Sequence, residues 1–212
     1  YVPVNPAFSP NELEFILTDS DPSLLVVDHN RGNEPFAKCA GLLSDEAGSA
    51  LCAPCEPAEI EIATGGRSLC AAMLYTSGTT GRPKGAQMSH TNIIRTFTAF
   101  NRLWKISSDD RFLHVLPMFH AHGLLMAVLC PLFAGAQIVL MEKFSADDVI
   151  ARLPDVTAIM AVPTIYSRLL ERPDVTSETC RNLRLATSGS APLSPELFDA
   201  MRTRTDVGLI DR

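Results

Sequence analysis

The chain has 212 residues, of which 46% are hydrophobic and 20% charged, as expected of a globular protein with one or two domains. Its formal net charge of −6 argues against a general nucleic-acid binder or a polybasic membrane anchor, yet leaves room for a local cationic pocket. The longest uncharged apolar run, residues 123–136, contains Pro131 and is shorter than the roughly 20 residues of a membrane helix, so we expect no membrane insertion.

Residues 1–68 are predicted to form an α/β segment with a loop-rich connection. Ser9 is a helix N-cap, because Pro10 follows it and Glu12 lies three residues on. The apolar run at residues 24–28 predicts a buried strand. Residues 41–68 are rich in small residues, glycine, proline and acids, and predict loops.

The six cysteines give only weak signals of chemistry. Cys52 and Cys55 have the C-x-x-C spacing that zinc or redox sites use, but no second pair or nearby histidine follows. Cys70 and Cys130 lie in apolar runs and are predicted to be small core residues. No targeting peptide is visible, so we expect a reduced, cytoplasmic protein, or one of the mitochondrial matrix if it is eukaryotic.

Residues 69–212 alternate between strand and helix patterns and form the second predicted domain. Strands are predicted over residues 69–75, 112–116, 137–141, 157–162 and 183–187, and helices over residues 89–105, 123–134, 145–153, 163–170 and 194–203. Such alternation predicts a mostly parallel sheet covered by helices. Ligands of these sheets bind at the carboxyl ends of the strands, so the segments that follow strands are the candidate sites.

The segment after the first of these strands, residues 75–85, reads YTSGTTGRPKG. Its glycines permit a sharp turn and a close approach of the main chain to a ligand. Exposed N–H groups, hydroxyls and one cation would then cradle a polyphosphate, and the side chains concerned are Thr76, Ser77, Thr79, Thr80 and Lys84. The spacing is not that of a Walker A motif. The alternative is a flexible surface loop.

This loop resembles the signature loop of the adenylate-forming superfamily, which includes acyl-CoA synthetases, adenylation domains of peptide synthetases and firefly-type luciferases. The resemblance extends over residues 1–212 and implies an internal part of the large N-terminal domain of such an enzyme. It implies a reaction in two steps. A carboxylate attacks the α-phosphate of ATP to give an acyl-adenylate and pyrophosphate, and coenzyme A then takes the acyl group. Fixed donors would stabilise the charge on the leaving pyrophosphate, with magnesium sharing that work.

The resemblance also assigns residues to nucleotide binding. For two residues of the loop, Thr80 and Lys84, the resemblance also implies a catalytic role, and Thr80 is implied to contact magnesium. The residues implied to bind nucleotide are Thr76, Ser77, Gly78, Thr79, Thr80, Gly81, Arg82, Pro83, Lys84, Ser188, Gly189, Ser190, Ala191 and Pro192. The last five lie after a predicted strand, and in the family the corresponding segment lies against adenine. The alternative is an ordinary turn that leads to Ser194 at the start of a helix, and the segment can serve both purposes.

Two further residues are implied to contact the acid. His120 matches the family position that orients carboxylate and α-phosphate, and no general base is needed because a carboxylate is already ionised at neutral pH. Otherwise His120 or His122 caps a helix, or the two histidines bind a metal. Arg168 matches the arginine that grips the distal carboxylate in malonyl-CoA synthetases, a use that suits the guanidinium fork. Its alternative is a side chain that reaches out to solvent.

Malonate is therefore the expected acid, with malonyl-CoA as the product. A fatty-acyl or aryl-CoA ligase of the same superfamily and a non-catalytic nucleotide-binding domain remain alternatives. The family's Y-G-x-x-E segment, whose glutamate holds magnesium, is expected just beyond Arg212, with a ribose-binding aspartate and a lysine of a small C-terminal domain later still. Residues 1–212 alone are expected to bind nucleotide weakly and not to complete the reaction.

Overall fold

The computed structural model describes residues 1–28, 42–45, 66, 68–76 and 83–212. Contacts within the chain divide it into two compact units, Tyr1–His90 and Thr91–Arg212. The boundary between these units differs from the domain division predicted at residues 68 and 69, and that division stays a prediction.

The first unit begins with helix α1 (Pro10–Ser20), which starts at the predicted N-cap. The Ser9 N–H donates to Glu12 Oε2 at 2.9 Å and the Glu12 N–H donates to Ser9 Oγ at 3.4 Å, which completes a capping box. Strand β1 (Leu25–Asp28) pairs in parallel with β2 (Leu42–Asp45). Strand β2 lies within residues 41–68, which were predicted to be loops. The prediction missed this strand because a pattern of four residues among small and acidic neighbours is too short to indicate one.

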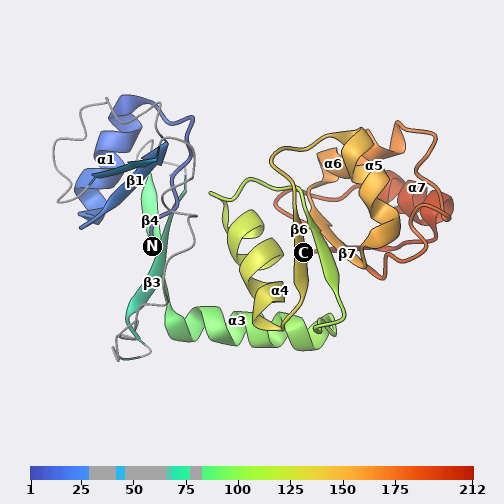
Figure 1. The fold of residues 1–212 in the computed structure, drawn as a ribbon, viewed down its shortest axis with the longest axis horizontal. Coiled ribbons are helices and arrows are strands. Elements are labelled where there is room, and N and C mark those ends of the chain that lie inside the picture. The colour runs from blue at the N-terminus through green and yellow to red at the C-terminus, as the bar shows by residue number, and fades with distance from the viewer. Residues whose placement is uncertain (29–41, 46–65, 67, 77–82) are drawn as a thin grey trace. The chain divides into compact units, whose positions relative to one another are not determined.

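Strands β3 (Cys70–Thr76) and β4 (Lys84–Ser89) form an antiparallel hairpin in the same unit, as Figure 1 shows. The prediction placed β3 within one residue at each end but missed β4, since the segment KGAQMS holds few apolar residues and no β-branched or aromatic residue. The Tyr75 hydroxyl donates to Asp19 Oδ2 at 2.5 Å and so ties the hairpin to α1. Cys70 is exposed, which corrects its prediction as a core residue.

The second unit is built on a five-stranded sheet in which every pair of neighbours is parallel. The mostly parallel α/β fold predicted from the sequence is thereby confirmed. The last strand of the sheet was not predicted, because its short run before the charged Asp211 carries little signal. In spatial order the strands are β6 (Gln137–Leu140), β5 (Arg111–His114), β7 (Ala158–Ala161), β8 (Leu185–Ser188) and β9 (Leu209–Asp211).

Helices cover both faces of this sheet (Figure 1). Helix α3 (His90–Leu103) precedes β5, and a π-helix, η2 (His122–Leu129), continues into α4 (Cys130–Phe133) on one side of the sheet. On the other side lie α5 (Ala146–Arg152), the short 3₁₀ turn η3 (Leu153–Asp155), α6 (Pro163–Leu170) and α7 (Pro195–Thr205). None of the helices in the described parts of the chain is both long and apolar enough to cross a bilayer.

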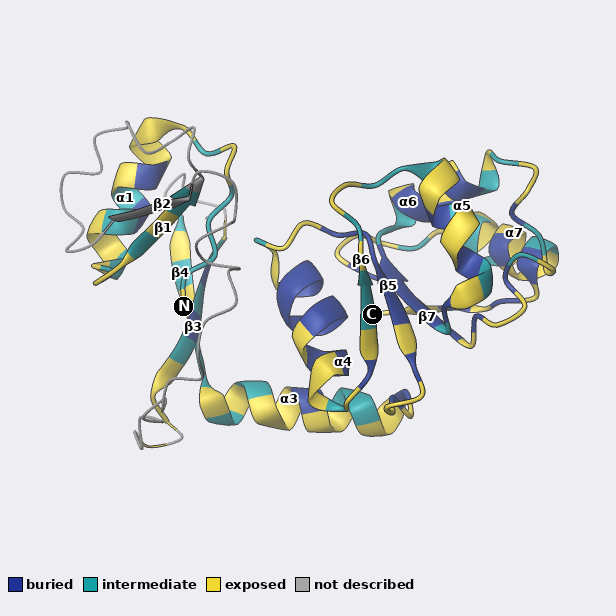
Figure 2. Ribbon diagram, viewed as in Figure 1, coloured by how far each residue is buried: buried dark blue, intermediate teal, exposed yellow. Residues whose placement is uncertain are grey.

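The segment predicted as one α-helix over residues 123–134 is therefore the π-helix η2 followed by α4. All of η2 except Leu129 is buried, as its dark colour in Figure 2 shows. Asn101 Nδ2 donates to the Cys130 carbonyl at 2.9 Å, and the Phe97 and Phe133 rings lie 6.0 Å apart between centroids. Cys130 is fully buried, as predicted, and these contacts join α4 to α3.

Candidate functional site

Buried polar atoms without partners gather at the carboxyl end of the parallel sheet. Among the residues that the structure describes, these side-chain atoms are His114 Nδ1, His122 Nε2, Thr187 Oγ1 and Ser188 Oγ. His114 ends β5, Thr187 and Ser188 end β8, and His122 begins η2. Since buried polar groups are normally hydrogen-bonded, the cluster marks this edge as a place for a bound ligand or ordered water.

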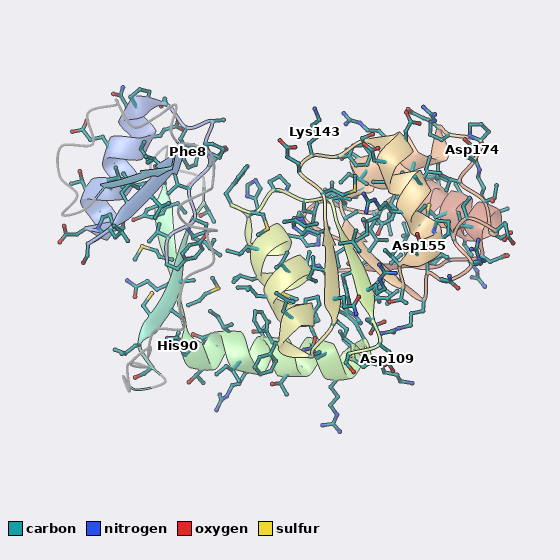
Figure 3. All side chains as sticks on the ribbon, in the orientation of Figure 1. Phe8, His90, Asp109, Lys143, Asp155 and Asp174 are labelled. Atoms are coloured by element: carbon teal, nitrogen blue, oxygen red, sulfur yellow. The ribbon has the colours of Figure 1, made fainter. Side chains whose placement is uncertain are left out.

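Figure 3 allows this edge to be located by two labelled residues. Lys143 follows β6 and lies at the carboxyl end of the sheet, whereas Asp109 precedes β5 and lies at the opposite end. The four unpartnered atoms therefore belong to the end marked by Lys143, which is where ligands of parallel sheets bind.

The turn between β5 and η2 is held in a tight conformation. A Cβ on Gly123 would lie 2.1 Å from the Pro117 carbonyl oxygen, so only glycine fits there. The His120 N–H donates to Pro117 O at 3.3 Å, and His114 Nε2 donates to Gly123 O at 3.2 Å. A buried histidine and a close main-chain approach thus fix the start of η2, and π-helical turns are frequent at functional sites.

His120 lies on this turn and is exposed, with its ring 4.5 Å from the Phe119 ring between centroids. It is therefore open to a ligand at the carboxyl end of β5. The N-cap residue of η2 is Ala121, so neither His120 nor His122 is the N-cap of that helix. No group of three or more His, Cys, Asp or Glu side chains in the described residues could hold a metal.

The segment after β8 approaches the same turn. The Gly189 N–H donates to Ala161 O at 3.2 Å, and Ser190 has a φ of 66°, in the left-handed region. Ser190 Oγ and His122 Nδ1 share a hydrogen bond of 3.0 Å. This bond brings together two predicted segments that follow strands separated by β7. Ser188 and Gly189 are buried, whereas Ser190, Ala191 and Pro192 are exposed and offer a small-residue surface for a flat ring.

Arg212 is a candidate site residue that the sequence prediction missed. Its N–H donates to the Ser188 carbonyl at 3.0 Å, and a Cβ on Gly189 would lie 3.0 Å from both its Cγ and its Nε. Arg212 directly follows β9, the strand that was not predicted. Had β9 been recognised, the rule that ligands bind after strands would have pointed to Arg212.

Burial sets the charge states of the two buried histidines. Desolvation, with the positive charge of Arg212 and the neighbouring His114 adding to it, lowers the pKa of His122 to about 4. Burial likewise lowers the pKa of His114, although its bond to the Gly123 carbonyl opposes the shift. Both rings are therefore neutral near pH 7, which leaves Arg212 as the positive group beside Gly189.

Arg168 lies on α6, the helix that follows β7. Its side chain is exposed, and its guanidinium carbon lies 5.9 Å from the centroid of the Phe144 ring. Strands β5 and β7 are neighbours in the sheet, so Arg168 and His120 follow adjacent strands. The guanidinium of Arg168 lies over the Phe144 ring.

The predicted phosphate loop spans the two strands of the β3–β4 hairpin in the first unit. Thr76 ends β3 and pairs in register with Lys84, which begins β4, and both residues are exposed. Ser77, Gly78, Thr79, Thr80, Gly81 and Arg82 lie outside the described residues, as do Cys52 and Cys55. The roles predicted for the loop therefore remain predictions, with Lys84 now placed on a strand.

These features agree with the family to which the chain belongs. Residues 1–210 match the AMP-binding enzyme family, so the protein is a member of that family. Among curated proteins, it is 36% identical over 228 residues to the mitochondrial malonate–CoA ligase ACSF3 of Mus musculus, which covers 95% of this chain and 38% of that protein. It is also 34% identical to a feruloyl-CoA synthase of Amycolatopsis sp, with 93% of this chain and 40% of that protein covered.

Solved structures show the same relationship. Apo MatB from Rhodopseudomonas palustris superposes on this chain with a TM-score of 0.89 at 33% identity and covers 100% of this chain and 44% of its own. A malonyl-CoA ligase in a ternary product complex with methylmalonyl-CoA and AMP gives a TM-score of 0.87 at 30% identity, with 100% of this chain and 45% of that chain covered. The chain thus spans less than half the length of each of these four proteins.

Proposed function

We propose that the full-length protein is an ATP-dependent acid–CoA ligase that forms an acyl-adenylate and then an acyl-CoA, with malonate as its acid. The observation that carries this proposal is the cluster of unpartnered buried polar atoms at the carboxyl ends of β5 and β8, in a chain of the AMP-binding family. The His122–Ser190 bond joins the two segments that border this cluster.

The proposed division of labour follows the chemistry of each segment. The hairpin loop between Thr76 and Lys84 would hold the phosphates, since N–H groups, hydroxyls and an ammonium stabilise the charge on departing pyrophosphate. The segment 188–192 would carry the adenine. His120, exposed at the turn before η2, would orient the acid against the α-phosphate. Magnesium would accompany ATP and neutralise phosphate charge, with Thr80 as its proposed contact.

Malonate is favoured over other acids for two reasons. The relatives named above include malonate–CoA ligases, and Arg168 supplies an exposed guanidinium on the helix after β7, next to the strand that leads to His120. A second carboxylate is the group that such a fork binds well. The similarity to feruloyl-CoA synthase supports an aryl acid as the second candidate, with a fatty acid as a third.

The substrate proposal is tested by ATP–pyrophosphate exchange in the full-length protein with malonate, methylmalonate, acetate, octanoate and ferulate. Exchange that depends on malonate is expected. Exchange with ferulate or octanoate but not with malonate would overturn the choice of acid. Nucleotide binding without exchange for any acid would instead favour the non-catalytic alternative.

Arg168→Ala tests the residue on which the choice of acid depends. Loss of a charge-assisted hydrogen bond should lower kcat/KM for malonate by about 10- to 100-fold and that for acetate much less. Arg202→Ala removes an exposed arginine from α7 and serves as the matched control. Equal losses of kcat/KM for malonate and acetate would show that Arg168 does not bind the second carboxylate.

The proposed compartment follows from the names of the relatives. Four animal relatives are mitochondrial malonate–CoA ligases, which supports the mitochondrial matrix if this protein is eukaryotic. The cytoplasm remains the proposal for a bacterial source. The proposed partners are therefore the small molecules malonate, ATP and coenzyme A, and the net charge of −6 argues against nucleic acid.

A further inference from the structure

His122 links the two segments of the site through a side chain that is almost fully buried. His122 is 6% exposed, and its Nδ1 shares a 3.0 Å hydrogen bond with Ser190 Oγ. The ring also lies against the main chain of Gly189, since a Cβ there would be 3.2 Å from His122 Cε1. The next residue, Gly123, leaves no room for a side chain, because a Cβ there would clash with the Pro117 carbonyl oxygen.

Ser190 is one of four non-glycine residues with positive φ in the described parts of the chain. Left-handed backbone is unfavourable for a residue with a Cβ, and such residues persist where surrounding contacts hold them. The other three residues, Asp21, Lys105 and Asp206, follow helices α1, α3 and α7, where a left-handed residue commonly ends a helix. Ser190 instead follows a strand, and its hydroxyl bonds to the ring of His122.

We propose that His122 is a positioning residue, which holds Ser190 in its left-handed conformation and thereby shapes the main chain of residues 188–190 that faces the ligand. The nature of that ligand, the adenine of ATP, rests on the proposed function. His122 would act through Ser190 rather than by touching the reacting atoms.

The geometry explains why a histidine suits this position. A neutral imidazole can share a hydrogen bond with a hydroxyl while its flat ring packs against the buried main chain of Gly189, whereas an apolar ring could only pack. A charged ring would face the guanidinium of Arg212, which lies against the same glycine. Nε2 is buried without a partner, so the second ring nitrogen remains available to ligand or water.

Four variants of the full-length protein test the proposal in the pyrophosphate exchange reaction. His122→Phe keeps the ring but loses the bond, and His122→Asn keeps a polar atom near the place of Nδ1. Ser190→Ala loses the hydroxyl and keeps the unfavourable φ, whereas Ser190→Gly loses the hydroxyl but adopts positive φ freely. We expect KM for ATP to rise about 5- to 10-fold in His122→Phe and Ser190→Ala, as for one lost hydrogen bond, with a smaller fall in kcat.

The remaining two variants separate positioning from direct contact. The rise in KM for ATP should be smaller in Ser190→Gly than in Ser190→Ala. It should also be smaller in His122→Asn than in His122→Phe. If Ser190→Gly is as impaired as Ser190→Ala, the hydroxyl contacts the ligand directly and the proposal is overturned. Thr205→Ala, which removes a buried hydroxyl bonded to the Met201 carbonyl in α7, controls for a general loss of stability and should leave KM unchanged.

A double variant gives a readout that does not depend on the reaction. His122→Phe and Ser190→Ala remove one shared bond, so their effects on the midpoint of thermal unfolding should be less than additive when combined. Additive effects would overturn the proposal. Non-additivity in a protein that shows no exchange with any acid would keep the positioning role and reject the proposed function.

Discussion

Arg184 and Asp110 form a two-point ion pair at the amino end of the parallel sheet. Arg184 Nε donates to Asp110 Oδ1 at 2.8 Å, and a terminal N–H of the guanidinium bonds to Oδ2. Thr157 Oγ1 also donates to Asp110 Oδ1, at 2.7 Å. These three residues directly precede β8, β5 and β7, so one buried carboxylate joins the starts of three neighbouring strands.

Removal of the guanidinium should destabilise the second unit. Arg184→Met leaves the carboxylate of Asp110, which is 2% exposed, without its main partner, and we expect a loss of about 3 kcal/mol in the free energy of unfolding. Urea denaturation measures this loss. Arg181→Ala removes an exposed pair with Glu178 and should cost less than about 0.5 kcal/mol. Similar losses in both variants would mean that burial does not strengthen the pair.

The same carboxylate should make stability sensitive to acid. Burial raises the pKa of Asp110, but hydrogen bonds from Arg184, Thr157 and the Ser107 N–H outweigh burial and hold this pKa below its ordinary value. Because the folded pKa is depressed, the stabilisation is present above about pH 4 and is lost as pH falls below it. Asp110→Asn should be less stable at pH 7, with a flatter decline of the unfolding midpoint below pH 4. An unchanged slope would contradict this expectation.

A second acid effect should come from His122 at a higher pH. Its pKa is lowered to about 4, mainly by burial, so the unfolded chain binds a proton more readily than the folded protein between about pH 6.5 and 4. Stability should therefore fall as pH falls through this window. His122→Asn, which does not titrate, should show a smaller difference in free energy of unfolding between pH 7 and 4.5. The buried His114 should still contribute part of the decline in that variant.

Gly123 should tolerate no side chain. In Gly123→Ala the new Cβ would lie 2.1 Å from the Pro117 carbonyl, so the turn that carries His120 must move. We expect a loss of about 2 kcal/mol in stability and a fall in exchange activity. Gly208→Ala is the matched control, because no atom lies within 4 Å of its Cβ, and it should be neutral or stabilising by up to about 1 kcal/mol. Full activity in Gly123→Ala would argue against a fixed turn.

Local signals in the sequence identified elements where short-range chemistry decides the outcome. Ser9 and Ser194 begin α1 and α7 as predicted, since an N-cap hydroxyl bonds to an N–H only three residues away. The apolar runs of β7 and β8 also predicted buried strands correctly, because both faces of those strands are covered. Thr76 and Lys84 were recognised as parts of one loop motif, but their pairing across a hairpin was not.

Pairing and close approach depend on segments far apart in the chain. Strands β2, β4 and β9 have weak patterns of their own and are strands because each meets a partner. The start of η2 is fixed by the contacts of Gly123 with Pro117 and His114, which no periodicity in the sequence predicts. Arg212 was not predicted as a site residue because it follows β9, whose pairing with β8 the sequence does not show.

The amino-acid sequence by itself determined the alternation of strands and helices, the family to which the chain is similar, and the segments in which ligands would bind. Those properties depend on side-chain type and on spacing within one segment. Only the tertiary structure decided that His122 meets Ser190 and that Asp110 meets Arg184, because the residues of each pair lie 68 and 74 positions apart and the sheet brings them together.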